Sequence, residues 1–133
     1  MADPPTEPTT EPPAEPPATP AIRGVVYPSA DVADSIAFYR DGLGFTVTLV
    51  DGDHYAALDG RGTTLAITAQ DDDVTSGAPA ITVKVDDLSA TLAALVDLGA
   101  RVERAPETGA HETRAVVRDP AGHPVVIYTS RPT

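Results

Sequence analysis

Three histidines and one acidic run supply the side chains of this chain that could bind a metal ion. The histidines are His54, His111 and His123, and the run of three aspartates covers residues 71–73. No two histidines stand four residues apart, as a pair of ligands on one helical turn would. His123 follows a turn sequence and the aspartates fall in a polar linker, so a structural or solvated role explains each of them. These residues predict no metal centre.

Nucleophilic catalysis has no recognisable machinery either. The chain has no cysteine, and none of its serines stands in a Gly-x-Ser-x-Gly turn. The pair Gly42 and Gly44 lacks the rest of a phosphate-binding glycine motif. His54 and Tyr128 could act as acid, base or electrostatic stabiliser, but nothing in the sequence places two such groups together. We therefore predict no catalytic residue.

The charge balance limits the partners. Nine Lys and Arg residues stand against 20 Asp and Glu residues, which gives a formal net charge of −11. Nucleic-acid binding requires a basic face, so we expect no nucleic-acid partner. The negative charge would suit a cationic ligand, although solubility alone explains it. No apolar run is long enough to cross a membrane and no apolar signal region opens the chain, so we expect a cytoplasmic protein without a membrane partner.

Residues 1–20 differ in composition from the rest of the chain. They are rich in proline, glutamate and threonine, with Glu7, Glu11 and Glu15 at regular intervals, and offer almost nothing apolar to bury. This composition predicts a disordered tail, which could be a spacer or a ligand for a partner, and which is most simply a solvated extension. The folded domain is expected to span residues 21–133.

The spacing of apolar residues in the folded domain predicts the helices and strands that hold these side chains in place. An apolar stripe formed by Val32, Ile36, Tyr39 and Leu43 predicts a helix that begins at the N-cap Asp31 and ends at the glycines after it. Expected strands around it cover residues 23–27, 45–50, 54–58 and 63–69. After a linker at residues 70–77, the order recurs with a helix at 87–98 and strands at 80–85, 101–105, 113–118 and 124–129.

The two halves match one another. Asp31 corresponds to Asp87 at the start of each helix, and Asp59 to Asp119 in the turn before each last strand. A repeat of this length predicts a duplicated module. The fold class is therefore α+β, with two βαβββ modules at about residues 22–69 and 79–129.

Two motifs carry a resemblance to a known family. Asp-Val-x-x-Ser-Ile-x-Phe-Tyr-x-x-x-Leu-Gly-Phe at residues 31–45 and Asp-Pro-x-Gly-His at residues 119–123 resemble those of the vicinal oxygen chelate superfamily. This superfamily includes glyoxalase I, extradiol dioxygenases, fosfomycin-modifying enzymes and bleomycin-resistance proteins. The resemblance implies a curved mixed sheet around a cleft, with helices on the outer face, and a homodimer with clefts near the subunit interface.

The resemblance also indicates where a metal would bind. Metal-dependent members carry four ligands in the cleft, seven residues before each helix-opening aspartate and seven after each turn aspartate. In this chain the four positions hold Gly24, Ala80, Ala66 and Val126. None of these side chains has an atom that could coordinate a divalent metal. We expect the family's metal site to be absent and the protein to use no cofactor.

Strand alternation divides the remaining side chains between two faces. The face under the helices is expected to hold Val25, Tyr27, Leu65, Ile67, Ile81, Val83, Val85, Val125 and Ile127. The ligand-binding cleft is expected to be lined by Gly24, Val26, His54, Thr64, Ala66, Thr68, Ala80, Thr82, Lys84, Arg114, Val116, Arg118, Val126 and Tyr128. On the third strand of each module, the side chains expected to face the cleft are His54, Ala56 and Leu58 in the first module and, matched to them, Arg114, Val116 and Arg118 in the second. The alternative is that the other side chains of these strands face the cleft, namely Tyr55, Ala57, Ala115 and Val117. Lys84 is either a solvated residue at the rim or a cation that faces a ligand.

Three hypotheses for function follow. The first is a metal-independent binding protein, similar to the bleomycin-resistance branch, that sequesters an antibiotic or related natural product in a dimer cleft. The second is an enzyme of the same fold, such as a glyoxalase-like lyase or isomerase or a dioxygenase-like enzyme, that acts without the metal site. The third is an interaction module whose proline-rich tail recruits a partner.

Overall fold

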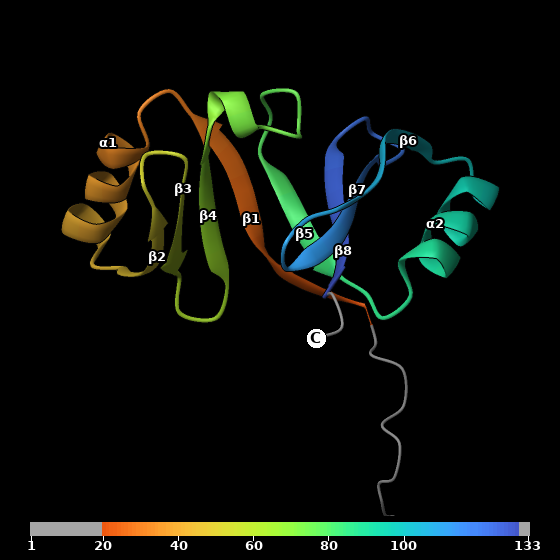
Figure 1. The fold of residues 1–133 in the computed structure, drawn as a ribbon, viewed down its shortest axis with the longest axis horizontal. Helices are drawn as coiled ribbons and strands as arrows, with labels where there is room; N and C mark the ends of the chain where they lie inside the picture. The colour runs from red at the N-terminus through yellow and green to blue at the C-terminus, as the bar shows by residue number, and fades with distance from the viewer. Residues whose placement is uncertain (1–19, 131–133) are drawn as a thin grey trace, which may run out of the picture.

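The computed structural model describes residues 20–130, which form an eight-stranded sheet. The sheet is curved and has a helix at each end (Figure 1). The predicted tail lies outside the described residues, apart from Pro20. The strands are β1 (Ala21–Ser29), β2 (Thr46–Asp51), β3 (Tyr55–Asp59), β4 (Thr64–Ala69), β5 (Ala80–Lys84), β6 (Arg101–Thr108), β7 (Glu112–Arg118) and β8 (Pro124–Ser130). The helices are α1 (Val32–Ala37), its π-helical continuation η1 (Phe38–Gly42), the 3-10 turn η2 (Gln70–Asp72) and α2 (Leu88–Asp97). No helix within residues 20–130 is long and apolar enough to cross a membrane.

The strand order β2-β3-β4-β1-β5-β8-β7-β6 joins two βαβββ modules edge to edge. In each module the first strand pairs in parallel with the last, β1 with β4 and β5 with β8. The antiparallel pair β1 and β5 connects the modules at the centre of the sheet. The predicted α+β class and the two modules are confirmed. Two strands are clearly longer than expected. The first is β1, which extends beyond residues 23–27 at both ends. The second is β6, which continues through Pro106 to Thr108 as an edge strand, where a proline is tolerated.

The pairing of β1 with β5 has the symmetry of a duplicated module. Val26 pairs with Ala80, and Gly24 pairs with Thr82. In the repeat, Gly24 corresponds to Ala80 and Val26 corresponds to Thr82. Exchanging the two modules therefore converts the pair Val26 and Ala80 into the pair Thr82 and Gly24. The modules are therefore related by an approximate two-fold axis that passes between the central strands.

Both helices begin with the same cap. The side chain of Asp31 accepts a hydrogen bond of 3.0 Å from the backbone N–H of Asp34, and Asp87 accepts one of 3.0 Å from Ala90. Each bond satisfies an N–H group that has no partner within the helix, and each carboxylate lies at the positive end of the helix dipole. The predicted N-caps are confirmed.

Replacing Asp87 by alanine is expected to lower the free energy of unfolding by about 1 kcal/mol, because the first turn of α2 loses its cap. Asp86→Ala is the matched control, since Asp86 is an exposed neighbour outside the helix. Urea unfolding at pH 7 followed by circular dichroism measures both values. Equal stability of the two variants would contradict the assigned cap.

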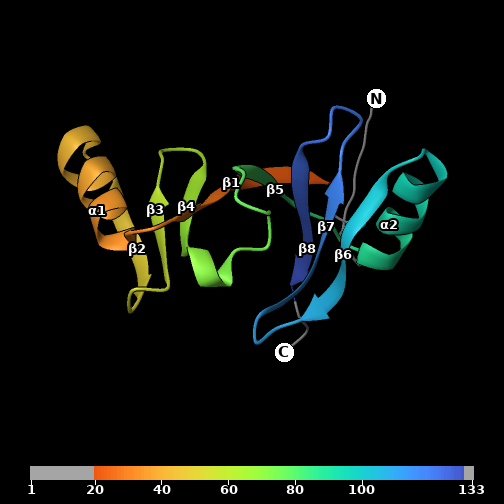
Figure 2. The ribbon, with the colours of Figure 1, turned by 90° about the horizontal axis from the view of Figure 1, so that it is seen from above.

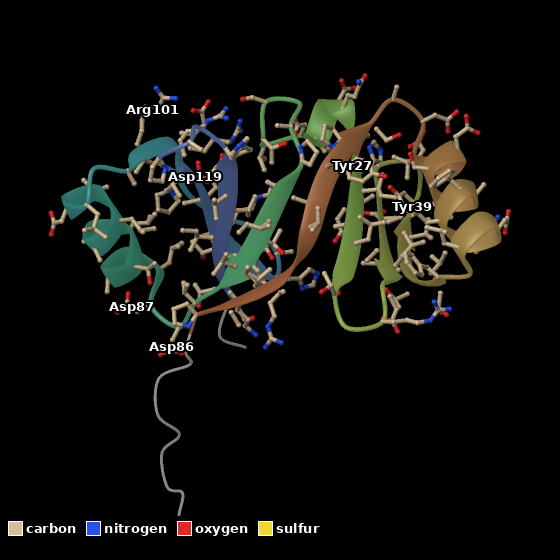
Figure 3. The ribbon with its side chains drawn as sticks, turned by 180° about the vertical axis from the view of Figure 1, so that it is seen from behind. Tyr27, Tyr39, Asp86, Asp87, Arg101 and Asp119 are labelled. Carbon is tan, nitrogen blue, oxygen red and sulfur yellow. The ribbon has the colours of Figure 1, made fainter. Side chains whose placement is uncertain are left out.

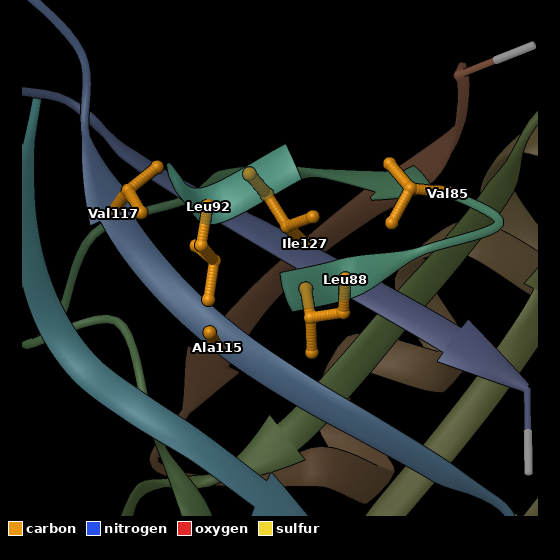
Figure 4. Close-up of a cluster of buried hydrophobic side chains, with 6 residues drawn as sticks. All are labelled: Val85, Leu88, Leu92, Ala115, Val117 and Ile127. Atoms are coloured by element: carbon orange, nitrogen blue, oxygen red, sulfur yellow. The ribbon is translucent and has the colours of Figure 1, made fainter. Parts of the chain in front are cut away.

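Two apolar clusters hold the helices against the same face of the sheet. Under α1, the buried residues are Val32, Ile36, Ala56, Leu58 and Ile67. Under α2, they are Val85, Leu88, Leu92, Ala115, Val117 and Ile127 (Figure 4). Tyr27 and Tyr39 face one another beside the first cluster, with ring centroids 6.4 Å apart (Figure 3). Burial, together with a hydrogen bond to Tyr39, raises the pKa of Tyr27 far above its usual range, so its hydroxyl stays protonated.

The third strand of each module is β3 in the first and β7 in the second. The prediction of which of its side chains face the cleft is wrong for β3 and right for β7. Ala56 and Leu58 pack under α1, so neither faces the cleft. Ala115 and Val117 pack under α2, which leaves Val116 on the other face, as preferred. The reason is the hairpin length. The pair Asp59 and Thr64 encloses residues 60–63, whereas the pair Arg118 and Pro124 encloses residues 119–123. One additional residue reverses the faces of a strand.

Two residues expected under the helices lie outside both clusters. Val25 is half-buried and Ile81 is exposed, and they pair with each other on the central strands. The helices lie at the two ends of the sheet and leave this central strip uncovered (Figure 2). The other residues expected on this face, such as Leu65, Val83 and Val125, pack against the clusters as predicted.

Candidate functional site

The face of the sheet opposite the helices, called here the helix-free face, collects almost all of the predicted cleft residues. Strand pairing places on it Gly24, Val26, Thr64, Ala66, Thr68, Ala80, Thr82, Lys84, Arg114, Val116, Arg118, Val126 and Tyr128. The remaining residue, His54, precedes β3 and is in phase with Ala56, which packs under α1. Its exposed ring lies 3.2 Å from the carboxylate of Asp72 and 3.7 Å from that of Asp53. The structure therefore places His54 among acidic residues away from that face.

The four family metal positions lie together on the central strands of this face. Val26 is paired with Ala66 on one side and with Ala80 on the other, and Thr82 is paired with both Gly24 and Val126. Their side chains carry no donor atom, so they do not fit a metal ion. Within residues 20–130, no group of three or more His, Cys, Asp or Glu side chains could hold one.

Gly24 occupies a position with no room for any side chain. A Cβ atom built there would collide with the backbone carbonyl oxygen of Thr64 on β4. The two parallel strands approach closely at this point, and Gly24 itself is buried. A metal-ligating side chain could therefore enter this position only if β1 or β4 moved.

The connection between the modules covers one end of the helix-free face. Residues 70–79, called here the crossover, run from the end of β4 to the start of β5 (Figure 1). Val74 of the crossover packs against the buried cluster of Ala80, Val116 and Val126, together with Val26. Two of the four metal positions therefore lie under an apolar cap. The crossover itself was predicted, but its contact with the sheet was not.

Asp73 fixes the shape of the crossover. Its carboxylate accepts hydrogen bonds from the backbone N–H and the hydroxyl of Thr75, at 2.8 and 2.6 Å, and from the N–H of Gly77 at 2.6 Å. Burial alone would raise the pKa of Asp73, but these hydrogen bonds and the charge of Arg104 outweigh it and lower the pKa. Thr75 is only 2% exposed. The prediction of a solvated aspartate run is right for Asp71 and Asp72, which are exposed, and wrong for Asp73.

The opposite end of the helix-free face holds a pocket of about 470 Å³. It lies where β1 begins and where β5 and β8 end. Its lining consists of Ile22, Arg23, Asp59, Gly62, Thr63, Thr64, Lys84 and Tyr128. Of the predicted cleft residues, it brings together Thr64, Lys84 and Tyr128, and the last two are direct neighbours on paired strands. We call this space the pocket end.

Arg23 is the lining residue that sequence reasoning missed most clearly. Strict alternation along β1 would place it on the helix-bearing face with Val25 and Tyr27. The register between β1 and β5 shifts between Ile22 and Gly24, so Arg23 is an additional residue without a partner on β5. A bulge of this kind re-aims a side chain. The sequence around Arg23 carries no signal for it.

Two tyrosines on this face remain neutral at physiological pH. Burial raises the pKa of Tyr55, and the charge of Glu112 raises it further. Burial and the charge of Glu112 also raise the pKa of Tyr128, against a smaller opposing effect of Arg23. Their hydroxyls are therefore hydrogen-bond donors and poor bases.

The two predicted arginines of β7 have acidic neighbours. Arg114 lies 3.8 Å from the carboxylate of Glu112. Arg118 lies 3.3 Å from the carboxylate of Glu103, and it also donates a hydrogen bond of 2.9 Å to the carbonyl oxygen of Gly122. Neither residue lines the pocket. Both positions are therefore explained by ion pairs within the second module.

Comparison with known proteins agrees with this architecture. The family model of the glyoxalase/bleomycin resistance protein/dioxygenase superfamily matches residues 21–127. An uncharacterized protein from Mycolicibacterium smegmatis is 35% identical over 108 residues, which cover 81% of this chain and 92% of that protein.

Solved structures show the same fold at lower sequence identity. A superfamily member from Vibrio splendidus 12B01 has a TM-score of 0.66 at 20% identity and covers 84% of this chain and 100% of its own. Methylmalonyl-CoA epimerase from Mycobacterium tuberculosis has a TM-score of 0.63 at 20% identity, with coverages of 84% and 88%. Homoprotocatechuate 2,3-dioxygenase from Arthrobacter globiformis has a TM-score of 0.60 at 24% identity, with coverages of 82% and 35%. The chain belongs to the glyoxalase/bleomycin resistance protein/dioxygenase superfamily, the family that its two motifs resemble.

Proposed function

We propose that this protein binds a small organic molecule at the pocket end of the helix-free face, without a metal ion at the family's metal positions. The observation that carries the proposal is the contrast between the two ends of this face. One end is filled by Val74 of the crossover, and the other keeps a pocket of about 470 Å³. That volume lies in the range of ordinary small-molecule sites.

The mode of action that we propose is sequestration of a natural product, such as an antibiotic, without chemical change. The lining supplies hydroxyl groups, charged groups and the ring of Tyr128, which suit a ligand with polar and apolar parts. Tyr128 is a neutral donor, and the Oδ1 atom of Asp59 already accepts a hydrogen bond of 2.8 Å from the N–H of Arg61. These features support binding more than proton transfer.

An enzyme of the glyoxalase-like lyase or isomerase type is the second candidate. One observation favours it: a carboxylate, Asp59, and an amine, Lys84, line the same pocket. These groups could in principle move a proton on a bound molecule. Such a reaction would need no metal ligand from the four family positions.

A homodimer is part of the proposal. The central strip of the helix-bearing face, which includes Val25 and Ile81, is not covered by either helix of the same chain. Together with exposed Ile22, it offers an apolar surface that a second copy could cover.

Native mass spectrometry of the full chain purified from its host tests these points together. We expect a dimer that retains one small molecule per chain and no stoichiometric transition metal. Incubating the released molecule with fresh protein, followed by chromatography, is expected to return it unchanged. A changed product would favour the enzyme, and a stoichiometric transition metal bound at the family positions would contradict the proposal.

A further inference from the structure

We infer that the molecule bound at the pocket end carries an anionic group, a carboxylate or a phosphate, and that Arg23 and Lys84 hold this group. The inference rests on the proposed binding function and adds the chemical class of the ligand. It reverses the expectation from net charge, since a chain of charge −11 would be expected to favour a cation.

The first argument is the pairing of the basic side chains. Eight Lys and Arg residues lie within residues 20–130, and six of them lie within 4.0 Å of a carboxylate or donate to a backbone carbonyl oxygen. These six are Arg40, Arg61, Arg101, Arg104, Arg114 and Arg118. The two without such a partner in this part of the chain are Arg23 and Lys84, and both line the pocket. Although the chain has 20 acidic residues, these two cations have no acidic partner among residues 20–130, and both line a pocket where a ligand could supply one.

The second argument is where the two cations lie. Lys84 is at the end of β5, where it pairs with Ala21 of β1 and with Tyr128 of β8. Arg23 follows two residues after Ala21, at the bulge of β1. Adjacent strands therefore bring two positive charges to the lining of one pocket, where both would attract a bound anion. An arginine and a lysine together suit a carboxylate or a phosphate group.

The third argument is the rest of the lining. Asp59 is the one acidic residue among the lining side chains, so the charged groups of the pocket sum to +1. No ion pair joins Asp59 to Arg23 or Lys84, and Asp59 instead caps the turn through Arg61. The hydroxyls of Thr64 and Tyr128 can donate to an anion, and the Tyr128 ring offers an apolar surface beside it. The expected ligand is thus an organic anion with an apolar body.

Titration with three probes of matched shape tests the inference. Benzoate, phenyl phosphate and neutral benzamide are added to the isotope-labelled full chain, and the amide resonances of Thr64, Lys84 and Tyr128 are followed by NMR. We expect saturable shifts of these resonances from at least one of the two anions, weaker binding at higher salt, and at least tenfold weaker binding of benzamide. The stronger of the two anions identifies the group as carboxylate or phosphate.

Charge-neutralising variants provide the second arm. Arg23→Gln and Lys84→Gln are each expected to weaken binding of the better anion about tenfold, and the double variant is expected to abolish it. Arg40→Gln is the matched control, because Arg40 pairs with Asp41 on the surface and is expected to leave affinity unchanged.

Several outcomes would overturn the inference. They are benzamide binding as tightly as the anions, full affinity in the double variant, or no saturable shift of the pocket resonances by either anion at millimolar concentration. Benzamide binding at the pocket would still support the proposed binding function. That function fails separately if native mass spectrometry of the full chain from its host finds no retained molecule.

Discussion

Replacing Gly24 by histidine is expected to lower the free energy of unfolding by about 3 kcal/mol and to create no metal site. The imidazole would be introduced at the first of the four family positions. Its Cβ atom would collide with the backbone oxygen of Thr64, and backbone cannot move aside as a flexible side chain can. The other three positions, Ala66, Ala80 and Val126, would still offer no donor atom.

Two further substitutions separate the effects of size and chemistry. Gly24→Ala adds only the colliding methyl group and is expected to retain most of the loss in stability. Gly42→Ala is the control, since a Cβ atom there meets nothing within 4 Å. Urea unfolding measures stability, and calorimetric titration with Zn²⁺ and Ni²⁺ measures metal binding. A Gly24→Ala variant as stable as the parent would contradict the close approach of β1 and β4.

Replacing Asp73 by alanine is expected to lower the free energy of unfolding at pH 7 by about 2 kcal/mol. The backbone N–H groups of Thr75 and Gly77 would lose their acceptor, and hydrogen bonds to a charged group are among the stronger ones. The loss is smaller than for a fully buried carboxylate because Asp73 is only partly buried. Asp71→Ala, at an exposed neighbour, is expected to change stability by less than about 0.5 kcal/mol.

The effect of Asp73 is expected to depend on pH with a defined sign. The folded state lowers the pKa of this carboxyl, so its contribution is fully present above the unfolded value of about 3.9. As the pH falls below about 4 toward the lowered pKa, the folded and unfolded states both bind the proton and the contribution disappears. The difference between the parent and Asp73→Ala should therefore shrink in acid. A difference that stays constant down to pH 2 would contradict this role.

The parts of the fold that sequence reasoning predicted are those that local patterns determine. The caps Asp31 and Asp87, most of the apolar positions of the helices and the turn aspartates each depend on residues within a few positions. The exception is Leu43, which was expected on the apolar stripe of the first helix but is 52% exposed, because the helix ends in a π-helical turn before it. The duplication then placed the four metal positions together, because equal spacing in both modules leads to equivalent points on the sheet. Counting from the helix caps and from the turn aspartates, with the spacing that the resemblance implies, was sufficient for that conclusion.

The features that were missed depend on one-residue differences or on distant contacts. The reversed phase of β3 follows from a hairpin one residue shorter than its counterpart. Arg23 reaches the pocket through a bulge, and a bulge leaves the local sequence pattern unchanged. Asp73 and Val74 have roles only because the crossover folds back onto the sheet. Composition and periodicity carry no information on such contacts.

The approximate two-fold axis between β1 and β5 has a consequence for ligand stoichiometry. Two copies of one module would offer two equivalent sites, one at each end of the helix-free face. The crossover that joins the modules covers one end, so connectivity itself makes the two ends different. At the covered end, Pro28 of β1 pairs with Thr68 of β4. The corresponding pair of the second module lies at the open end and consists of Lys84 of β5 and Tyr128 of β8. In the proposed binding mode, one half of the face therefore serves packing and the other serves recognition, which gives one binding site for each pair of modules.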